Sequence, residues 1–103
     1  FKKRFEYFAQ RIYDTGKKAV FLTIPRYFGY YENDELKEKV KSFNDIIACK
    51  VSEFKSERAL LISGEQIVKS TSYLSADCLH PSTEGHVDMG YNLYDAVKNW
   101  INE

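Results

Sequence analysis

The stretch Ala19-Val20-Phe21-Leu22-Thr23-Ile24, closed by Pro25, decides the fold class of this chain. It is a continuous apolar run with β-branched side chains, and its length suits a strand better than a helix. A continuous rather than alternating run is typical of a strand covered on both faces, as in a parallel sheet. A second run of this kind, Ala59-Leu60-Leu61-Ile62, follows later in the chain. The sequence therefore predicts two buried, parallel strands.

Apolar residues recur at helical spacing before, between and after the two strands. The segment from Phe1 to Asp14 predicts an amphipathic helix, and Gly16 is a natural stop for it. Its predicted core stripe is Phe1, Phe5, Phe8 and Ile12. The longest stripe lies between the strands and consists of Leu36, Val40, Phe43, Ile47, Val51 and Phe54. A final helix is predicted from about Thr83, and one face of it carries Met89, Leu93, Ala96, Val97 and Trp100. All three stripes are expected to be core.

The order helix, strand, helix, strand, loop, helix is typical of a parallel sheet layered with helices. We expect an α/β, flavodoxin-like three-layer α/β/α sandwich. A short helical turn is expected around residues 66–68, after the second strand. Open sheets of this class usually contain about five or six strands, and only two are predicted here. Residues 1–103 are therefore expected to form the C-terminal portion of one larger domain.

The composition of the chain argues against two kinds of partner, nucleic acids and membranes, and bears on the state of its cysteines. Fifteen basic and fifteen acidic residues give a formal net charge of zero, which argues against a nucleic-acid partner. No apolar run approaches the roughly 20 residues of a membrane span. The two cysteines, Cys49 and Cys78, have no metal-type or redox spacing. Two free thiols are the expected state, with a disulfide as the less favoured alternative.

The stretch Asp77-Cys78-Leu79-His80-Pro81-Ser82-Thr83-Glu84-Gly85-His86 contains both histidines of the protein. A carboxylate three residues before a histidine can accept a hydrogen bond from its Nδ1–H in a tight turn. Such a bond leaves Nε2 as a base and stabilises the imidazolium that forms when Nε2 takes a proton. Pro81 disfavours helical geometry at His80, so the imidazole is expected to project from a loop. Ser82 or Thr83 can cap the following helix.

This D-x-x-H-P pattern, followed by Gly85-His86 and a terminal helix, resembles the last conserved block of the SGNH hydrolases, also called GDSL esterases and lipases. The resemblance covers the whole chain but only about the C-terminal half of that family's fold. It implies a serine ester hydrolase in which Asp77 is the triad acid and His80 the general base. It implies a small acyl, acetyl or carbohydrate ester as substrate, no cofactor, and a structural role for His86.

The other parts of that active site do not occur in the sequence. There is no G-D-S, and the pairs Asn33-Asp34 and Asn44-Asp45 lack the glycine of a G-x-N-D block. Ser63-Gly64 is only a fragment of a G-x-S-x-G elbow, and a turn explains it as well. We therefore expect no hydrolysis by this chain alone. A missing N-terminal half or self-association is expected to complete the sheet.

Two alternatives to the esterase reading remain. Asp77, His80, His86 and Asp88 are four potential metal ligands within twelve residues, although their spacing is unlike the usual zinc patterns. A non-catalytic α/β binding or structural module could also keep the fold without the chemistry. A strand followed by G-D-S upstream would favour the esterase over that module.

Overall fold

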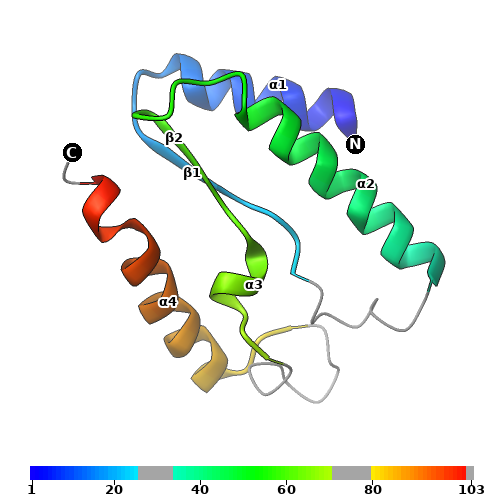
Figure 1. Cartoon of the computed structure of the whole chain (residues 1–103), viewed down its shortest axis with the longest axis vertical. Coiled ribbons are helices and arrows are strands. Elements are labelled where there is room, and N and C mark those ends of the chain that lie inside the picture. Colours follow the sequence, from blue (N-terminus) through cyan, green and yellow to red (C-terminus); the bar gives the residue numbers. More distant parts are fainter. Residues whose placement is uncertain (26–33, 71–79, 102–103) are drawn as a thin grey trace.

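A computed structural model describes residues 1–25, 34–70 and 80–101 (Figure 1). The described elements, in chain order, are α1 (Lys2–Asp14), β1 (Ala19–Leu22), α2 (Asp34–Val51), β2 (Ala59–Ile62), α3 (Gly64–Ile67) and α4 (Thr83–Ile101). The chain is therefore a mixed α/β protein, and the predicted order of helices and strands is confirmed. Both strands lie within the two apolar runs, and the last helix begins at the expected residue.

β1 and β2 form a two-stranded parallel sheet, as predicted. The register pairs Ala19 with Ala59 and Leu22 with Ile62. In Figure 1 the strands run between the α1–α2 pair and α4. β1 stops at Leu22, earlier than the apolar run does, and Thr23 to Pro25 continue outside the strand.

The main hydrophobic core fills the space between the sheet, α1 and α2. Its buried members are Ala9, Phe21, Ile47, Val51, Phe54 and Ala59. Aromatic rings tie α1 into it: the ring centroids of Tyr13 and Phe54 are 4.2 Å apart in a stacked pair. Phe5 meets Phe21 edge to face at 6.3 Å. Such pairs add about 0.5–1.5 kcal/mol each beyond the burial of their area.

The predicted core stripe of α1 is wrong in part. The side that faces the core carries Phe5, Ala9 and Tyr13. Phe8 and Ile12 keep 61% and 46% of their surface exposed, because they lie on a neighbouring side of the helix where no described element packs. Periodicity identified an apolar side of α1 correctly but not which of its residues have a packing partner.

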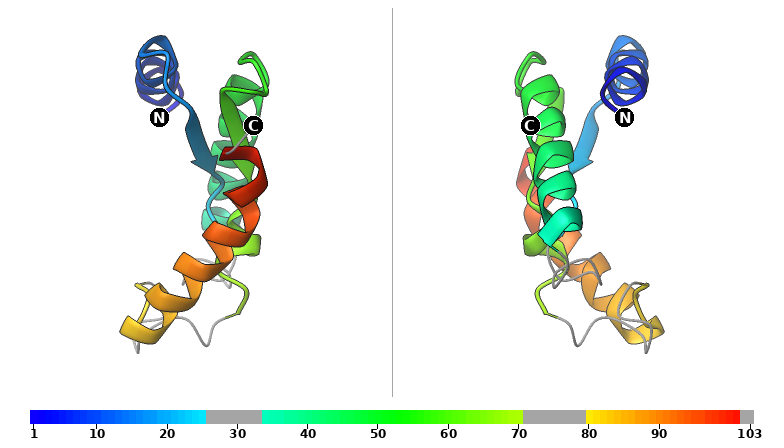
Figure 2. Two further views of the ribbon diagram at one scale, coloured as in Figure 1. Left: turned by 90° about the vertical axis from the view of Figure 1, so that its left-hand side faces the viewer. Right: turned by 90° about the vertical axis from the view of Figure 1, so that its right-hand side faces the viewer.

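β1 is also less covered than its sequence predicted. Val20 and Leu22 remain 37% and 40% exposed. The molecule is a slab with principal extents of 39 × 30 × 15 Å (Figure 2). Its radius of gyration is 14.5 Å, whereas a compact domain of about 100 residues has a radius near ~13 Å. The shape therefore leaves more apolar surface in contact with water than a closed domain would.

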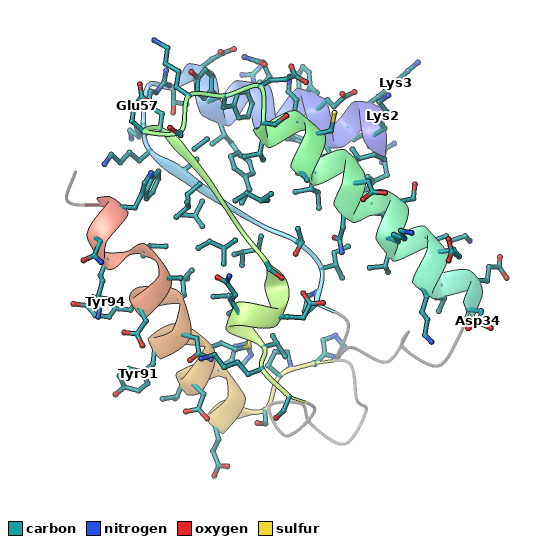
Figure 3. The ribbon with its side chains drawn as sticks, viewed as in Figure 1. Lys2, Lys3, Asp34, Glu57, Tyr91 and Tyr94 are labelled. Carbon is teal, nitrogen blue, oxygen red and sulfur yellow. The ribbon has the colours of Figure 1, made fainter. Side chains whose placement is uncertain are left out.

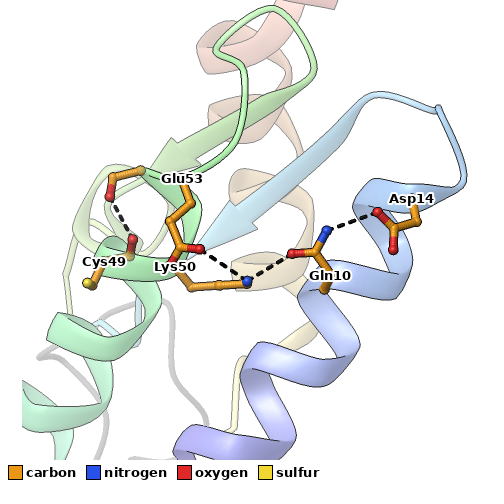
Figure 4. A network of polar contacts seen from close by, with 6 residues as sticks. Gln10, Asp14, Cys49, Lys50 and Glu53 are labelled. Carbon is orange, nitrogen blue, oxygen red and sulfur yellow. Dashed lines mark hydrogen bonds and ion pairs between the residues drawn. The ribbon is translucent and has the colours of Figure 1, made fainter.

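A polar network joins α1 to the last turn of α2 (Figure 4). Lys50 donates from Nζ to Gln10 Oε1 at 2.9 Å, and Gln10 in turn donates to Asp14 Oδ1 at 2.9 Å. The same ammonium lies 3.4 Å from the Glu53 carboxylate and 5.3 Å from the centre of the Phe54 ring. Because the Lys50 side chain is only 11% exposed, these partners satisfy a charge that is mostly removed from water.

The backbone beyond β1 is held by the side chain of Asn44 from α2. The Ile24 N–H donates to Asn44 Oδ1 at 2.8 Å, and Asn44 Nδ2 donates to the Ile24 carbonyl at 3.0 Å. The side-chain amide of Asn44 thus forms hydrogen bonds with both the N–H and the C=O of Ile24, as the backbone of a neighbouring strand would. Since the Ala19 and Thr23 N–H groups donate to residues of the β2 segment, Ile24 faces the opposite edge of β1. Asn44 therefore closes the end of that edge.

Asn44→Ala is expected to lower the free energy of unfolding by about 1–3 kcal/mol, because two part-buried backbone groups lose their partner. Urea unfolding followed by circular dichroism measures the change. Ser42→Ala is the matched control, because Ser42 is exposed on the same helix and gains a similar helix propensity. Equal effects of the two substitutions would show that the Asn44–Ile24 bonds contribute nothing.

Candidate active site

The direction of α4 is fixed by contacts at its C-terminal end and near its middle. At the C-terminal end, Trp100 Nε1 donates to the Ser56 carbonyl at 2.9 Å, and Lys18 Nζ donates to the Trp100 carbonyl at 2.8 Å. Ser56 precedes β2 and Lys18 precedes β1. Nearer its middle, Asn92 Nδ2 donates to the Ile67 carbonyl of α3 at 2.9 Å. α4 therefore runs antiparallel to the strands, and its N-terminus lies toward their carboxyl ends (Figure 1).

The carboxyl ends of β1 and β2 meet in a close backbone contact. The Gly64 N–H at the start of α3 donates to Thr23 Oγ1 at 2.8 Å. A Cβ on Gly64 would lie 2.3 Å from the Thr23 carbonyl oxygen and 2.7 Å from the Pro25 nitrogen. Only glycine fits here without a backbone shift. This contact sets the separation of the two strand ends at the edge where open α/β sheets bind their ligands.

The chain enters α4 through His80, Pro81 and Ser82. Ser82 caps the helix: the Gly85 N–H donates to Ser82 Oγ at 3.0 Å, and the His86 N–H donates to the Ser82 carbonyl at 2.9 Å. Of the two expected capping residues, Ser82 fills the role. His80 lies before this cap, outside the helix, with an exposed side chain, as the following proline predicted.

The predicted triad acid, Asp77, and Cys78 lie outside the described residues. The distance between the Asp77 carboxylate and the His80 imidazole therefore stays a prediction. His86 is in the first turns of α4 and is exposed. Cys49 is a free, exposed thiol on α2.

The metal-site alternative has no support in the described parts of the chain. Within residues 1–25, 34–70 and 80–101, no group of three or more His, Cys, Asp or Glu side chains is arranged to hold a metal ion. Three of the four ligands considered, His80, His86 and Asp88, belong to these residues; Asp77 does not.

The hydroxyl of Ser63, considered as a fragment of a nucleophile elbow, donates to Glu65 Oε2 at 2.7 Å. Ser63 is the N-cap residue of α3, with φ −64° and ψ 133°. Its hydroxyl is thus paired with a carboxylate of the following turn, which fits a strand-to-helix turn better than an activated nucleophile.

Sequence reasoning missed the structural roles of two residues at this edge, Asn44 and Gly64. Asn44 was considered only as part of an Asn-Asp pair, although it is the polar neighbour of Phe43 on the apolar stripe of α2. An amide beside an apolar stripe is partly removed from water and needs a hydrogen-bond partner, and this was the available signal. Gly64 follows directly after a strand, a position where glycine often permits a close backbone approach.

Comparison with protein families, with characterised proteins and with solved structures finds no match for this chain. None of the helices among the described residues is both long and apolar enough to cross a membrane.

Proposed function

We propose that this chain is the C-terminal part of a serine ester hydrolase of the SGNH type, acting on small acyl, acetyl or carbohydrate esters. Asp77 orients the His80 imidazole through its Nδ1–H. His80 Nε2 then removes the proton from a serine of the N-terminal part and returns it to the leaving alcohol. No cofactor is needed for this chemistry.

The observation that carries the proposal is the position of His80 and Pro81, the described end of the D-x-x-H-P block. The block ends at Pro81, directly before the capped start of α4, and α4 begins toward the carboxyl ends of two parallel strands. Catalytic side chains of open α/β domains gather at that edge. His80 is exposed and lies outside the helix, so its side chain can face a serine from a segment other than α4.

The N-terminal part required for the serine would also complete the fold as a three-layer, flavodoxin-like sandwich. β1 has β2 on one side, and Val20 and Leu22 point their backbone N–H and C=O groups to the other. A parallel strand there would pair with these two residues and stop at Ile24, whose groups are bonded to Asn44. Such a strand also protects an open edge of the sheet.

The proposal predicts hydrolysis of p-nitrophenyl acetate by the complete protein and none by residues 1–103 alone. The reason is that the nucleophile and the oxyanion hole must come from an upstream strand followed by G-D-S. Release of p-nitrophenolate measures the activity of both forms. A full-length product without G-D-S, or equal activity of the two forms, would instead support a non-catalytic α/β module.

A further inference from the structure

One exposed surface of α1 combines aromatic side chains with cations. Phe8 projects between two hollows of about 360 and 430 Å³, and Arg4 lines both of them. Arg4 and Arg11 flank Phe8 at the i−4 and i+3 positions of the helix, so all three share one side. We call Arg4, Phe8 and Arg11 the basic face of α1. Six Lys or Arg residues and only two carboxylates occur in residues 1–18, so this part of the chain is strongly positive.

α4 presents an exposed surface of opposite charge. Tyr91 is 69% exposed, and Figure 3 shows Tyr91 and Tyr94 projecting from α4 away from the strands. With Val87 and Gly90 they line a hollow of about 470 Å³. Among the described residues, and apart from the adjacent backbone of α4 itself, no atom lies within 4 Å of the position that a Cβ on Gly90 would take, so the glycine keeps this hollow open.

Two carboxylates flank the hollow of α4. Asp88 and Asp95 stand at i−3 and i+4 relative to Tyr91, on its side of the helix. Lys98 lies 3.6 Å from Asp95 and offsets part of that charge. We call Val87, Asp88, Gly90, Tyr91, Tyr94 and Asp95 the acidic face of α4.

We propose that the acidic face of α4 binds the basic face of α1 from a second copy of this chain. When the two helices run antiparallel, Phe8 enters the hollow above Gly90. The flanking positions then match, because Arg11 at i+3 meets Asp88 at i−3, and Arg4 at i−4 meets Asp95 at i+4. Antiparallel helix dipoles favour the same orientation.

The occupant is a second copy because one chain carries both complementary surfaces. α1 offers an aromatic side chain flanked by two cations, and α4 offers a hollow flanked by two carboxylates. The contact joins two different surfaces and is therefore heterologous. Repeated from copy to copy, such a contact forms an open chain of molecules or a closed ring. It involves neither Asp77 nor His80, and it stands or falls independently of the proposed esterase activity.

Sedimentation velocity of the 103-residue chain tests the proposal over about 10 µM to 1 mM, a range suited to a small interface. The weight-average mass is expected to rise with concentration and to fall again when salt screens the charges. Phe8→Ala and Gly90→Leu should each weaken association at least tenfold. A chain that stays monomeric throughout this range would overturn the proposal.

Charge reversal tests the pairing itself. Arg11→Glu and Asp88→Arg should each abolish association, and the variant with both changes should regain it. A mixture of the two single variants should associate although neither variant does so alone, because the unchanged faces of the two chains match each other and so do the two reversed faces. Lys41→Glu, an equal charge change at an exposed site of α2, is the control and should associate normally.

Three results would contradict this pairing. The first is association that survives both charge reversals, and the second is a mixture that stays monomeric. The third is a chain that remains monomeric yet binds vesicles of phosphatidylserine and phosphatidylcholine through Phe8, which would assign the basic face to a lipid surface instead.

Discussion

Replacement of His80 by alanine in the complete protein is expected to lower kcat/KM for p-nitrophenyl acetate by about 10²- to 10⁴-fold, the usual contribution of a general acid–base group. Without the imidazole, no group takes the serine proton during attack on the ester. KM should change far less than kcat, because His80 acts on the reacting atoms rather than on binding. Initial rates of nitrophenolate release measure both constants.

His86→Ala is the matched control for that experiment. Both histidines are exposed and are six residues apart, but only His80 lies outside α4, beside Pro81. The His86 variant should keep activity within a few-fold of the parent. Equal losses in the two variants would contradict the assignment of His80 as the base.

Gly64→Ala is expected to destabilise the fold by about 3 kcal/mol, at the upper end of the cost of overpacking. The new methyl group would lie 2.3 Å from the Thr23 carbonyl oxygen, which belongs to the backbone and cannot rotate away. Separation of the strand ends would also weaken the bond from the Gly64 N–H to Thr23 Oγ1. Thermal unfolding should show a fall in Tm of roughly 12–24 °C for a chain of this size.

Gly90→Ala is the control for the glycine substitution itself. Gly90 lies inside α4 with open space around it, so alanine should raise stability by about 0.5–1 kcal/mol through helix propensity. Thermal unfolding of this variant should be measured at low micromolar protein concentration, where self-association does not contribute to the measured stability. A Gly64 variant as stable as the Gly90 variant would refute the close contact between α3 and the end of β1.

The order and type of the elements followed from the sequence because they depend on local pattern. Both strands are short apolar runs, and α2 and α4 carry long stripes at helical spacing. The exposure of Phe8 and Ile12 did not follow, because periodicity defines a side of a helix and is silent about its packing partner. The exposure of Val20 and Leu22 did not follow either, because an apolar strand sequence does not show what covers each face of the sheet.

The candidate site was predicted only where its chemistry is local. The D-x-x-H-P spacing and the proline after His80 identified a histidine outside the helix, and Ser82 was one of two expected caps. The pairing of Asn44 with Ile24 and the contact of Gly64 with Thr23 join residues 20 and 41 positions apart. Such contacts depend on how α2 and α3 approach β1, which no local pattern encodes.

The central claim is that Asp77 and His80 activate a serine from outside this chain. Reaction of the complete protein with a fluorophosphonate, followed by peptide mass spectrometry, tests it most directly. The account predicts one modified serine, in a G-D-S sequence upstream of Phe1, and its loss in His80→Ala. Modification of Ser63, or labelling that persists without His80, would contradict it.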